Sequence, residues 1–502
     1  MKDYSRLLPA IAILASLFCH PLSSQAADET TLGIFSKQTD VGDCSKPGAV
    51  EFNSKTGEYT ITGGGGNIWG TNDAFHFVWK QMSGDFIFTA NVRFLGTNGD
   101  AHRKACLFAR QSLAPGSAYA DVAVHGVGLT SLQYRAAPNG ATHEIRSEVS
   151  GPTRVRLEKR GDYFSMWVAA PGEPLKLDGG YLSVPMTGDL FVGLGVCAHN
   201  NQTVSTAVFS DVELTPLPPP TAQPALECTL EIVNLALSDR TVVYHTRDHI
   251  EAPNWSRDGK HFYFNSGGRI YQLPVGGGTP EALATAPAIS CNNDHGISPD
   301  GTELAISDGT QGDKQSRIYL VPIGGGHARQ ITPLGPSYWH GWSPDGKILA
   351  YCAQRNGDFD IYTTSTAGGG ETRLTTTPGL DDGPDYSPDG KYIYFNSERT
   401  GLMQIWRMKP DGSEQEQITS DDNNNWFAHP SPDGKWIVFL SYDKSVKGHP
   451  ANQDVRLRLM SLADKKIRDL ATLFGGQGTI NVPSWSPDSS QLAFASYQLV
   501  YP

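Results

Sequence analysis

Positive charge is scarce and unclustered in this chain of 502 residues, which has 40 Lys and Arg residues against 52 Asp and Glu residues and a formal net charge of -12 at pH 7. Because phosphate contacts supply most of the affinity of proteins for nucleic acid, we do not expect an acidic chain without a basic run to bind it. Beyond the N-terminus, no stretch approaches the roughly 18–20 consecutive apolar residues that a membrane helix requires. We therefore expect no membrane span.

Several enzyme signatures are also missing. The sequence has no Gly-x-Ser-x-Gly elbow, no His-Glu-x-x-His motif and no Gly-x-x-x-x-Gly-Lys-Ser/Thr loop. The wide spacing of its cysteines excludes a zinc ribbon and a thioredoxin motif, and it leaves any disulfide pairing open. Helical periodicity is almost absent, so the predicted fold class is all-β.

The first residues have the pattern of a secretory signal peptide. Lys2 and Arg6 precede an apolar run over residues 7–18, and the small-residue site Ser24-Gln25-Ala26 follows. We predict a signal peptide over residues 1–26 and a periplasmic or secreted protein.

A proline-rich segment divides the rest of the chain. Residues 215–224 contain five prolines, which favour an extended spacer, and we predict a linker over residues 215–226. Before it, apolar and polar residues alternate in runs such as 86–94 and 154–159, as in half-buried strands. The stretches 66–92 and 191–200 resemble concanavalin-like jelly-roll domains, so residues 27–214 are predicted to form a β-sandwich. The resemblance implies a domain that binds glycans or packs beside a catalytic partner.

The second half of the chain repeats a motif around Ser-Pro-Asp-Gly six times. Its serines are Ser256, Ser298, Ser343, Ser387, Ser431 and Ser486, separated by 42 to 55 residues, which is close to the length of one propeller blade. The motif sets a tight turn, because Pro fixes φ and Gly relieves the strain at its end.

These repeats resemble those of TolB-like proteins, which implies a six-bladed β-propeller over residues 227–502. The last repeat ends after two strands, and residues 230–235 and 241–244 have the pattern of the missing outer pair. We predict that the two ends of this region share one blade, which would leave no open sheet edge.

Residues three to seven places before each motif serine are expected at one mouth of the propeller. Here His295 and His340 replace the proline that TolB-like repeats favour. Together with His429 or Asp382 across the channel, two neutral imidazoles on adjacent blades could ligate a divalent cation such as Ca²⁺, Mn²⁺ or Zn²⁺. The alternative is that each histidine hydrogen-bonds a neighbouring blade.

The candidate catalytic residues are therefore His295, His340, Tyr338 and Arg399. The candidate substrate-binding residues, from the same strands and from loops expected at the same mouth, are Glu251, Asn293, Asp382, Trp426, Arg355, Lys444 and Lys447. The Arg and Lys side chains among these residues could hold a carboxylate or sulfate. The alternative is that Arg355 and Arg399 pair with acids of the next blade.

Two functions are compatible with this set. In residue type the channel resembles that of oligogalacturonate lyases, which implies an exported carbohydrate-active protein, a metal-assisted lyase or hydrolase of acidic glycans. There the metal would neutralise a uronate carboxylate while a histidine removes the adjacent proton. The alternative is a non-catalytic module, either a glycan receptor or a TolB-like envelope scaffold that binds other proteins through the same face.

Overall fold

The computed structural model describes residues 32–501, and these form strands and connecting loops without a helix among them. The predicted all-β class is therefore confirmed. The predicted signal peptide lies outside the described residues.

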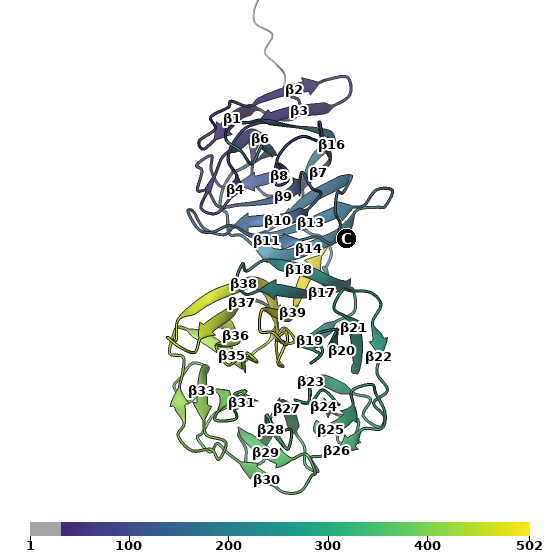
Figure 1. Cartoon of the computed structure of the whole chain (residues 1–502), viewed down its shortest axis with the longest axis vertical. Coiled ribbons are helices and arrows are strands. Elements are labelled where there is room, and N and C mark those ends of the chain that lie inside the picture. Colours follow the sequence, from purple (N-terminus) through teal and green to yellow (C-terminus); the bar gives the residue numbers. More distant parts are fainter. Residues whose placement is uncertain (1–31, 502) are drawn as a thin grey trace, which may run out of the picture. The chain divides into compact units, whose positions relative to one another are not determined.

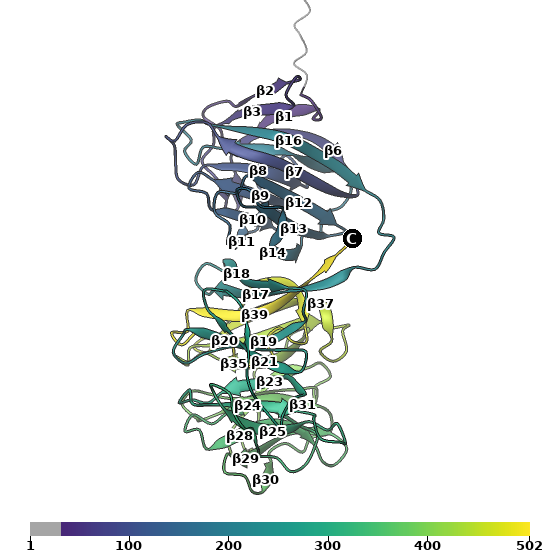
Figure 2. The ribbon, with the colours of Figure 1, turned by 90° about the vertical axis from the view of Figure 1, so that its right-hand side faces the viewer.

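Two sheets pack around one hydrophobic core in the N-terminal region (Figure 2). Alternation builds each sheet: in β12, Val155 and Leu157 are buried while Arg154 and Arg156 are only half-buried. The core joins both sheets, for example Phe88 of β7 and Leu107 of β8. This is the arrangement of a β-sandwich, and its concanavalin-like nature stays a prediction.

The first of these sheets has seven strands. In order they are β14 (Lys176–Ser183), β13 (Tyr163–Ala169), β12 (Arg154–Arg160), β7 (Asp85–Phe94), β16 (Ser205–Leu217), β3 (Glu58–Gly63) and β2 (Ala49–Asn53).

The second sheet has ten strands and extends into the C-terminal region. In order they are β1 (Lys37–Val41), β6 (Phe75–Met82), β15 (Leu190–Cys197), β8 (Lys104–Arg110), β9 (Tyr119–His125), β10 (Thr130–Arg135), β11 (His143–Arg146), β18 (Arg240–Thr246), β17 (Ala225–Asn234) and β39 (Gln491–Val500). A small hairpin, β4 (Ile68–Trp69) with β5 (Asn72–Asp73), completes the N-terminal region.

The predicted linker is shorter in the structure than in the sequence analysis. Strand β16 continues through Leu217 and pairs there with β7, while β17 begins at Ala225 and pairs with β39. Only residues 218–224 lie between these strands. A short parallel contact, Ile145 with Arg240 and Arg146 with Thr241, continues the ten-stranded sheet from β11 to β18.

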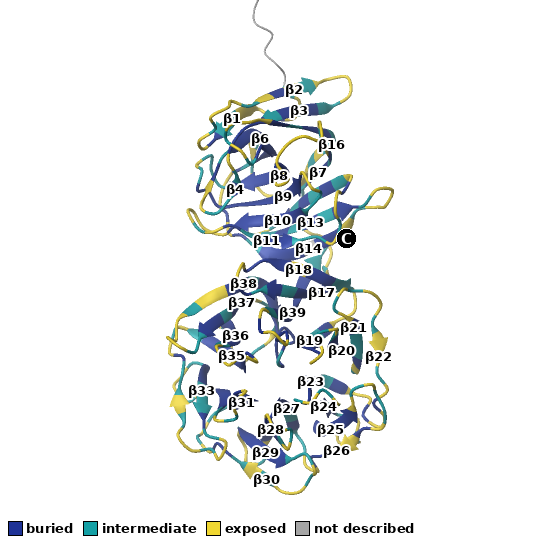
Figure 3. Cartoon of the chain, viewed as in Figure 1, coloured by how far each residue is buried: buried dark blue, intermediate teal, exposed yellow. Residues whose placement is uncertain are grey.

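Five sheets of four strands form a ring in the C-terminal region (Figure 1). They are β19 (Ile250–Trp255), β20 (His261–Ser266), β21 (Arg269–Pro274) and β22 (Glu281–Ala282); β23 (Cys291–Ile297), β24 (Glu303–Asp308), β25 (Arg317–Pro322) and β26 (Arg329–Gln330); β27 (Ser337–Trp342), β28 (Ile348–Gln354), β29 (Phe359–Ser365) and β30 (Glu371–Arg373); β31 (Asp381–Tyr386), β32 (Ile393–Ser397), β33 (Gln404–Met408) and β34 (Glu416–Gln417); and β35 (Asn423–Pro430), β36 (Trp436–Asp443), β37 (Ala451–Ser461) and β38 (Ile467–Gly476). The innermost strands are buried, whereas the outer strands β22 and β26 are exposed (Figure 3).

The predicted number of blades is corrected from six to five. The sixth repeat contributes β39, whose inner side has an isolated bridge between Trp485 and Leu492 but is paired with no further strand among residues 32–501. The two ends of the region do pair, since β39 runs antiparallel to β17 from Ala225 opposite Val500 to Asn234 opposite Gln491. These strands belong to the ten-stranded sheet, however, and do not form a separate four-stranded blade.

The repeated motif acts as a hydrogen-bonded clamp as well as a turn. In the second repeat the Ser298 hydroxyl donates to Asp300 at 2.6 Å and accepts the backbone N–H of Glu303 at 3.0 Å. Gly301 adopts φ +75°, which a residue with a side chain would rarely take. The clamp fixes where each innermost strand ends, and so it aligns the residues upstream of it at one mouth of the ring.

Candidate functional site

Each innermost strand of the ring is interrupted shortly before its motif serine. The pairing with the next strand shifts register between Glu251 and Asn254, Cys291 and His295, Trp339 and Gly341, Asp382 and Asp385, and Trp426 and His429. Such bulges bend a strand and re-aim its side chains, and they are common beside binding sites. Ala252 and Phe427 have a φ of +55°, which shows how far the backbone departs from a regular strand.

The bulged segments surround a cavity of about 530 Å³. Its lining combines carboxylates, amides and two imidazoles with apolar and aromatic side chains, and consists of Glu251, Asn292, Asn293, Asp294, Tyr338, His340, Cys352, Phe359, Leu380, Asp382, Phe427, His449, Gln477 and Asn481. Five predicted site residues therefore come together here: Glu251, Asn293, Tyr338, His340 and Asp382.

His340 and Asp382 form an ion pair in the wall of the cavity. The Nε2 atom of His340 lies 3.2 Å from Asp382 Oδ1, and its Nδ1 atom lies 3.3 Å from the carbonyl oxygen of Asn481. Because both neighbours are acceptors, both ring nitrogens must carry protons. Burial alone would lower the pKa of His340, but the hydrogen bond and charge of Asp382 raise it to about 9.

The carboxyl of Asp382 shows the complementary effect. Burial would raise its pKa, but His340 holds it down at about 2. At neutral pH the pair is therefore a fixed imidazolium and carboxylate. His340 in this state offers neither a free base nor a lone pair for a metal.

Glu251 is also paired. Its Oε1 atom lies 3.4 Å from His249 Nε2 and accepts a hydrogen bond of 3.3 Å from the side-chain amide of Asn293. The hydrogen bonds of His249 to Cys228 and to Glu251 raise the pKa of that histidine to about 10, although burial opposes them. His249 therefore balances the charge of Glu251.

Asp294 differs from these two carboxylates. Its exposed fraction is 6% and it lines the cavity, yet neither of its carboxylate oxygens has a hydrogen bond or ion pair within the part of the chain that the structure describes. Burial raises the pKa of Asp294 to about 7; the charge of His340 lowers it, and those of Asp382 and Glu251 add to the increase. Asp294 is not among the candidate residues predicted from the sequence, although Asn293 and His295 on either side of it both are.

The three histidines of the predicted metal site do not converge. His295 is fully buried outside the cavity lining, with Nε2 at 3.3 Å from the carbonyl oxygen of Tyr263. His429 is held by Asp385 at 3.0 Å and by the carbonyl oxygen of Ile480 at 2.8 Å, so both of its nitrogens are occupied. No group of three metal-ligating side chains is found among residues 32–501. The donor set does not fit a shared cation.

The predicted cationic residues are likewise engaged away from the cavity. Arg399 contacts Asp381 at 2.9 Å, and Arg355 contacts Glu371 at 2.7 Å and also donates to the carbonyl oxygen of Pro336. They therefore pair with acids, as the alternative interpretation expected, but these acids belong to the same blade as each arginine and not to the next blade. The remaining predicted residues do not line the cavity either: Lys444 and Lys447 are exposed, and Trp426 is buried in the core with its ring 4.4 Å from that of His449.

Comparisons with known proteins identify the ring. The family model for the TolB β-propeller domain matches residues 335–469. An uncharacterised protein of Agrobacterium fabrum is 51% identical over 274 residues, which is 54% of this chain and 93% of the relative. A solved structure from Agrobacterium tumefaciens, provisionally named TolB, is also 51% identical, with a TM-score of 0.53, and covers 54% of this chain and 99% of that chain.

A manganese complex of an oligogalacturonate lyase is a much more distant match. It is 13% identical with a TM-score of 0.35, and it covers 55% of this chain and 76% of that chain. This similarity is too low to carry any argument about activity. Within the described residues, no helix is long and apolar enough to cross a membrane.

Proposed function

Since the chain belongs to the family of TolB-like β-propeller proteins, we propose that it is a non-catalytic binding module that holds a segment of a partner protein in the cavity at one mouth of the ring. The predicted signal peptide supports a periplasmic location, and the partner is then a protein of the cell envelope. The resemblance of the repeats to TolB-like proteins favours the same partner class.

The observation that carries this proposal is the character of the cavity wall. Charged and amide groups from several strands alternate there with Tyr338, Phe359, Leu380 and Phe427. A polypeptide segment has a matching mixture of polar and apolar groups. A cavity of about 530 Å³ accommodates a few side chains rather than a whole domain, so the bound element is a short segment.

The carbohydrate-active hypothesis has less support from the site. A metal-assisted lyase needs a cation to neutralise the uronate and a free base to take the proton. Here His340 is bound to Asp382, and His295 and His429 lie elsewhere. Arg355 and Arg399, the cations expected to hold an acidic sugar, are paired with carboxylates.

A cavity-filling substitution tests the proposed function. Leu380, which is half-buried in the cavity wall, is replaced by Trp, and Leu334, which is 52% exposed outside the lining, receives the same substitution as a control. Each immobilised protein is incubated with solubilised envelope proteins from its own source bacterium, and retained proteins are quantified. We expect L380W to lose at least about 90% of a discrete partner that the wild type and L334W retain, because the new side chain occupies the space of the bound segment.

The same three proteins are incubated with a panel of uronic and neutral polysaccharides. The proposal expects no shortening of any polysaccharide. Depolymerisation by the wild type and by L334W but not by L380W would instead establish the enzyme hypothesis. Equal partner retention by L380W and the wild type would show that the cavity is not the binding site.

A further inference from the structure

Asp294 is the one cavity carboxylate whose bonding capacity is not met within the described part of the ring. Asp382 is neutralised by His340, and Glu251 is contacted by His249 and by the amide of Asn293. Within residues 32–501, Asp294 receives neither a cation nor an N–H donor, although its exposed fraction is only 6%. Burying a carboxylate without a partner is costly, so a fold that keeps one beside a cavity provides for a donor from outside.

Several ionisable groups interact with Asp294. They come from several elements: Glu251 on β19, Tyr338 and His340 on β27, the thiol Cys352 on β28, Asp382 on β31 and His449 on the loop after β36. The positive charge of His340 also acts on Asp294, but its proton is already shared with Asp382. Since His249 and His340 already balance Glu251 and Asp382, an anionic ligand would meet the unbalanced carboxylate of Asp294, whereas a cationic ligand would be stabilised by it.

The geometry favours an ammonium group over a guanidinium group. The acceptors belong to different innermost strands, β19 and β23, and Asn481 and Gln477 also line the cavity. Acceptors spread around a cavity suit three tetrahedral N–H donors better than the planar fork of arginine. Tyr338, Phe359, Leu380 and Phe427 then provide an apolar wall for the methylene chain.

We propose that Asp294 is the anchor of a lysine-recognition site, in which the cavity takes up the ammonium group of a lysine side chain from the bound partner segment. This inference rests on the proposed function and specifies the chemistry of the same cavity. The ammonium group donates hydrogen bonds to the Asp294 carboxylate and replaces the missing partner.

Binding of the ammonium group is then coupled to the release of a proton from Asp294. Free Asp294, with its pKa of about 7, is half protonated at neutral pH. An ammonium ligand requires the ionised form, so it expels the proton and binds more tightly as the pH rises. For a group with this pKa, the affinity is expected to increase about tenfold between pH 6 and pH 8.

Titration calorimetry on the full mature chain tests the site directly. The probes are Nα-acetyl-lysinamide and its norleucine analogue, which lacks the ammonium group. We expect the lysine probe to bind at pH 8 and the norleucine probe to bind at least about tenfold more weakly. Asp294→Asn should weaken the lysine probe about tenfold or more, since it removes a charge-assisted hydrogen bond but keeps the shape of the side chain.

Asp422→Asn is the matched control, because it removes one carboxylate that is 89% exposed and paired with Lys444. It should bind the lysine probe like the wild type. Equal binding of the two probes by the wild type, or equal binding of the lysine probe by wild type and D294N, would overturn the inference. If the partner retention described above still depends on Leu380 in that case, the binding function stands and only the lysine chemistry fails.

Discussion

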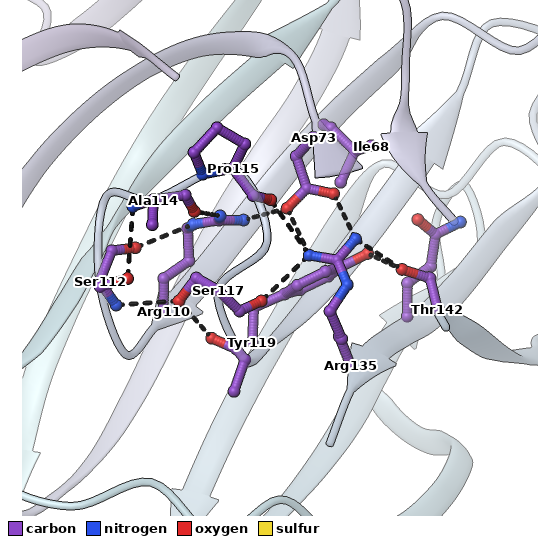
Figure 4. Close-up of polar contacts among 12 residues, drawn as sticks. Ile68, Asp73, Arg110, Ser112, Ala114, Pro115, Ser117, Tyr119, Arg135 and Thr142 are labelled. Carbon is purple, nitrogen blue, oxygen red and sulfur yellow. Dashed lines mark hydrogen bonds and ion pairs between the residues drawn. The ribbon is translucent and has the colours of Figure 1, made fainter. Parts of the chain in front are cut away.

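Asp73 in the N-terminal region and Asp294 in the ring are both buried carboxylates, yet their surroundings are opposite. Asp73 lies between Arg110 and Arg135, which it contacts at 2.7 Å each, and all three side chains are inaccessible to solvent (Figure 4). Both arginines also donate to backbone carbonyl oxygens, among them those of Ala114 and Ser117. Among the described residues, Asp294 has no such partner, and it borders a cavity.

The difference separates a structural charge from a functional one. The Asp73 network uses its acceptors completely and leaves nothing for a ligand, so it holds loops of the N-terminal region together. A missing partner alone is not sufficient evidence of a site, however. Asp121 is fully buried, and neither of its carboxylate oxygens has a hydrogen bond within residues 32–501, but it is enclosed, and burial raises its pKa well above the usual value. The unmet carboxylate and the adjoining cavity together point to a ligand at Asp294.

The largest effect is expected from breaking the satisfied network. Asp73→Asn would leave two buried guanidinium groups without a counter-charge, and the loss of one partner from a buried ion pair costs about 3–5 kcal/mol. Urea denaturation monitored by far-UV circular dichroism would measure this loss. A decrease below about 1 kcal/mol would show that the network is not structural, and the comparison with Asp294 would fail.

Removing the carboxylate charge of Asp294 should increase stability instead of decreasing it, and the increase should depend on pH. The raised pKa of Asp294 means that the folded protein holds this proton more tightly than the unfolded chain does. Wild-type stability therefore declines, relative to Asp294→Asn, as the pH rises from about 4 to about 7, and the difference then stays constant. We expect D294N to be more stable than the wild type by about 2–4 kcal/mol at pH 8 and nearly equal to it near pH 4.

Denaturation of both proteins at the two pH values would measure this difference. Other titrating groups are common to the two proteins, so their contributions largely cancel. A D294N protein that is less stable than the wild type at pH 8 would mean that Asp294 has a partner that stabilises its charge.

The repeat pattern predicted most of the fold but not the number of complete blades. Alternation and the six motifs indicated strands and a ring, and the pairing of β17 with β39 joins its two ends. The sequence could not show that this pair extends through β18 into a ten-stranded sheet, because the contact of β11 with β18 involves only two residue pairs. Sheet membership there depends on three-dimensional packing rather than on a local pattern.

The sequence predicted only part of the site, again because three-dimensional packing decides which side chains reach the cavity. Counting back from each motif serine found Glu251, His340 and Asp382, because the clamps align the innermost strands. The bulge between Cys291 and His295 then breaks the alternation of two residues on which such counting depends. Asp294 therefore lines the cavity while His295 does not, and no signal in the sequence distinguishes the two.

The smallest effect is expected at His295. A substitution there tests most directly whether Asp294 or its neighbour His295 belongs to the site. This imidazole is fully buried, and burial lowers its pKa to about 4, so it is neutral at physiological pH. Its single hydrogen bond, 3.3 Å to the carbonyl oxygen of Tyr263, is long, and its Nδ1 atom has no partner in the described chain. His295→Ala should therefore cost about 1–2 kcal/mol of stability, from lost packing and one weak hydrogen bond.

Binding of the lysine probe should stay within about twofold of the wild-type value in the protein that remains folded, because His295 lies outside the cavity wall. Calorimetric titration and denaturation of the same preparation measure both quantities. A variant of unchanged stability that no longer binds the probe would place His295 in the site and restore the sequence-based prediction.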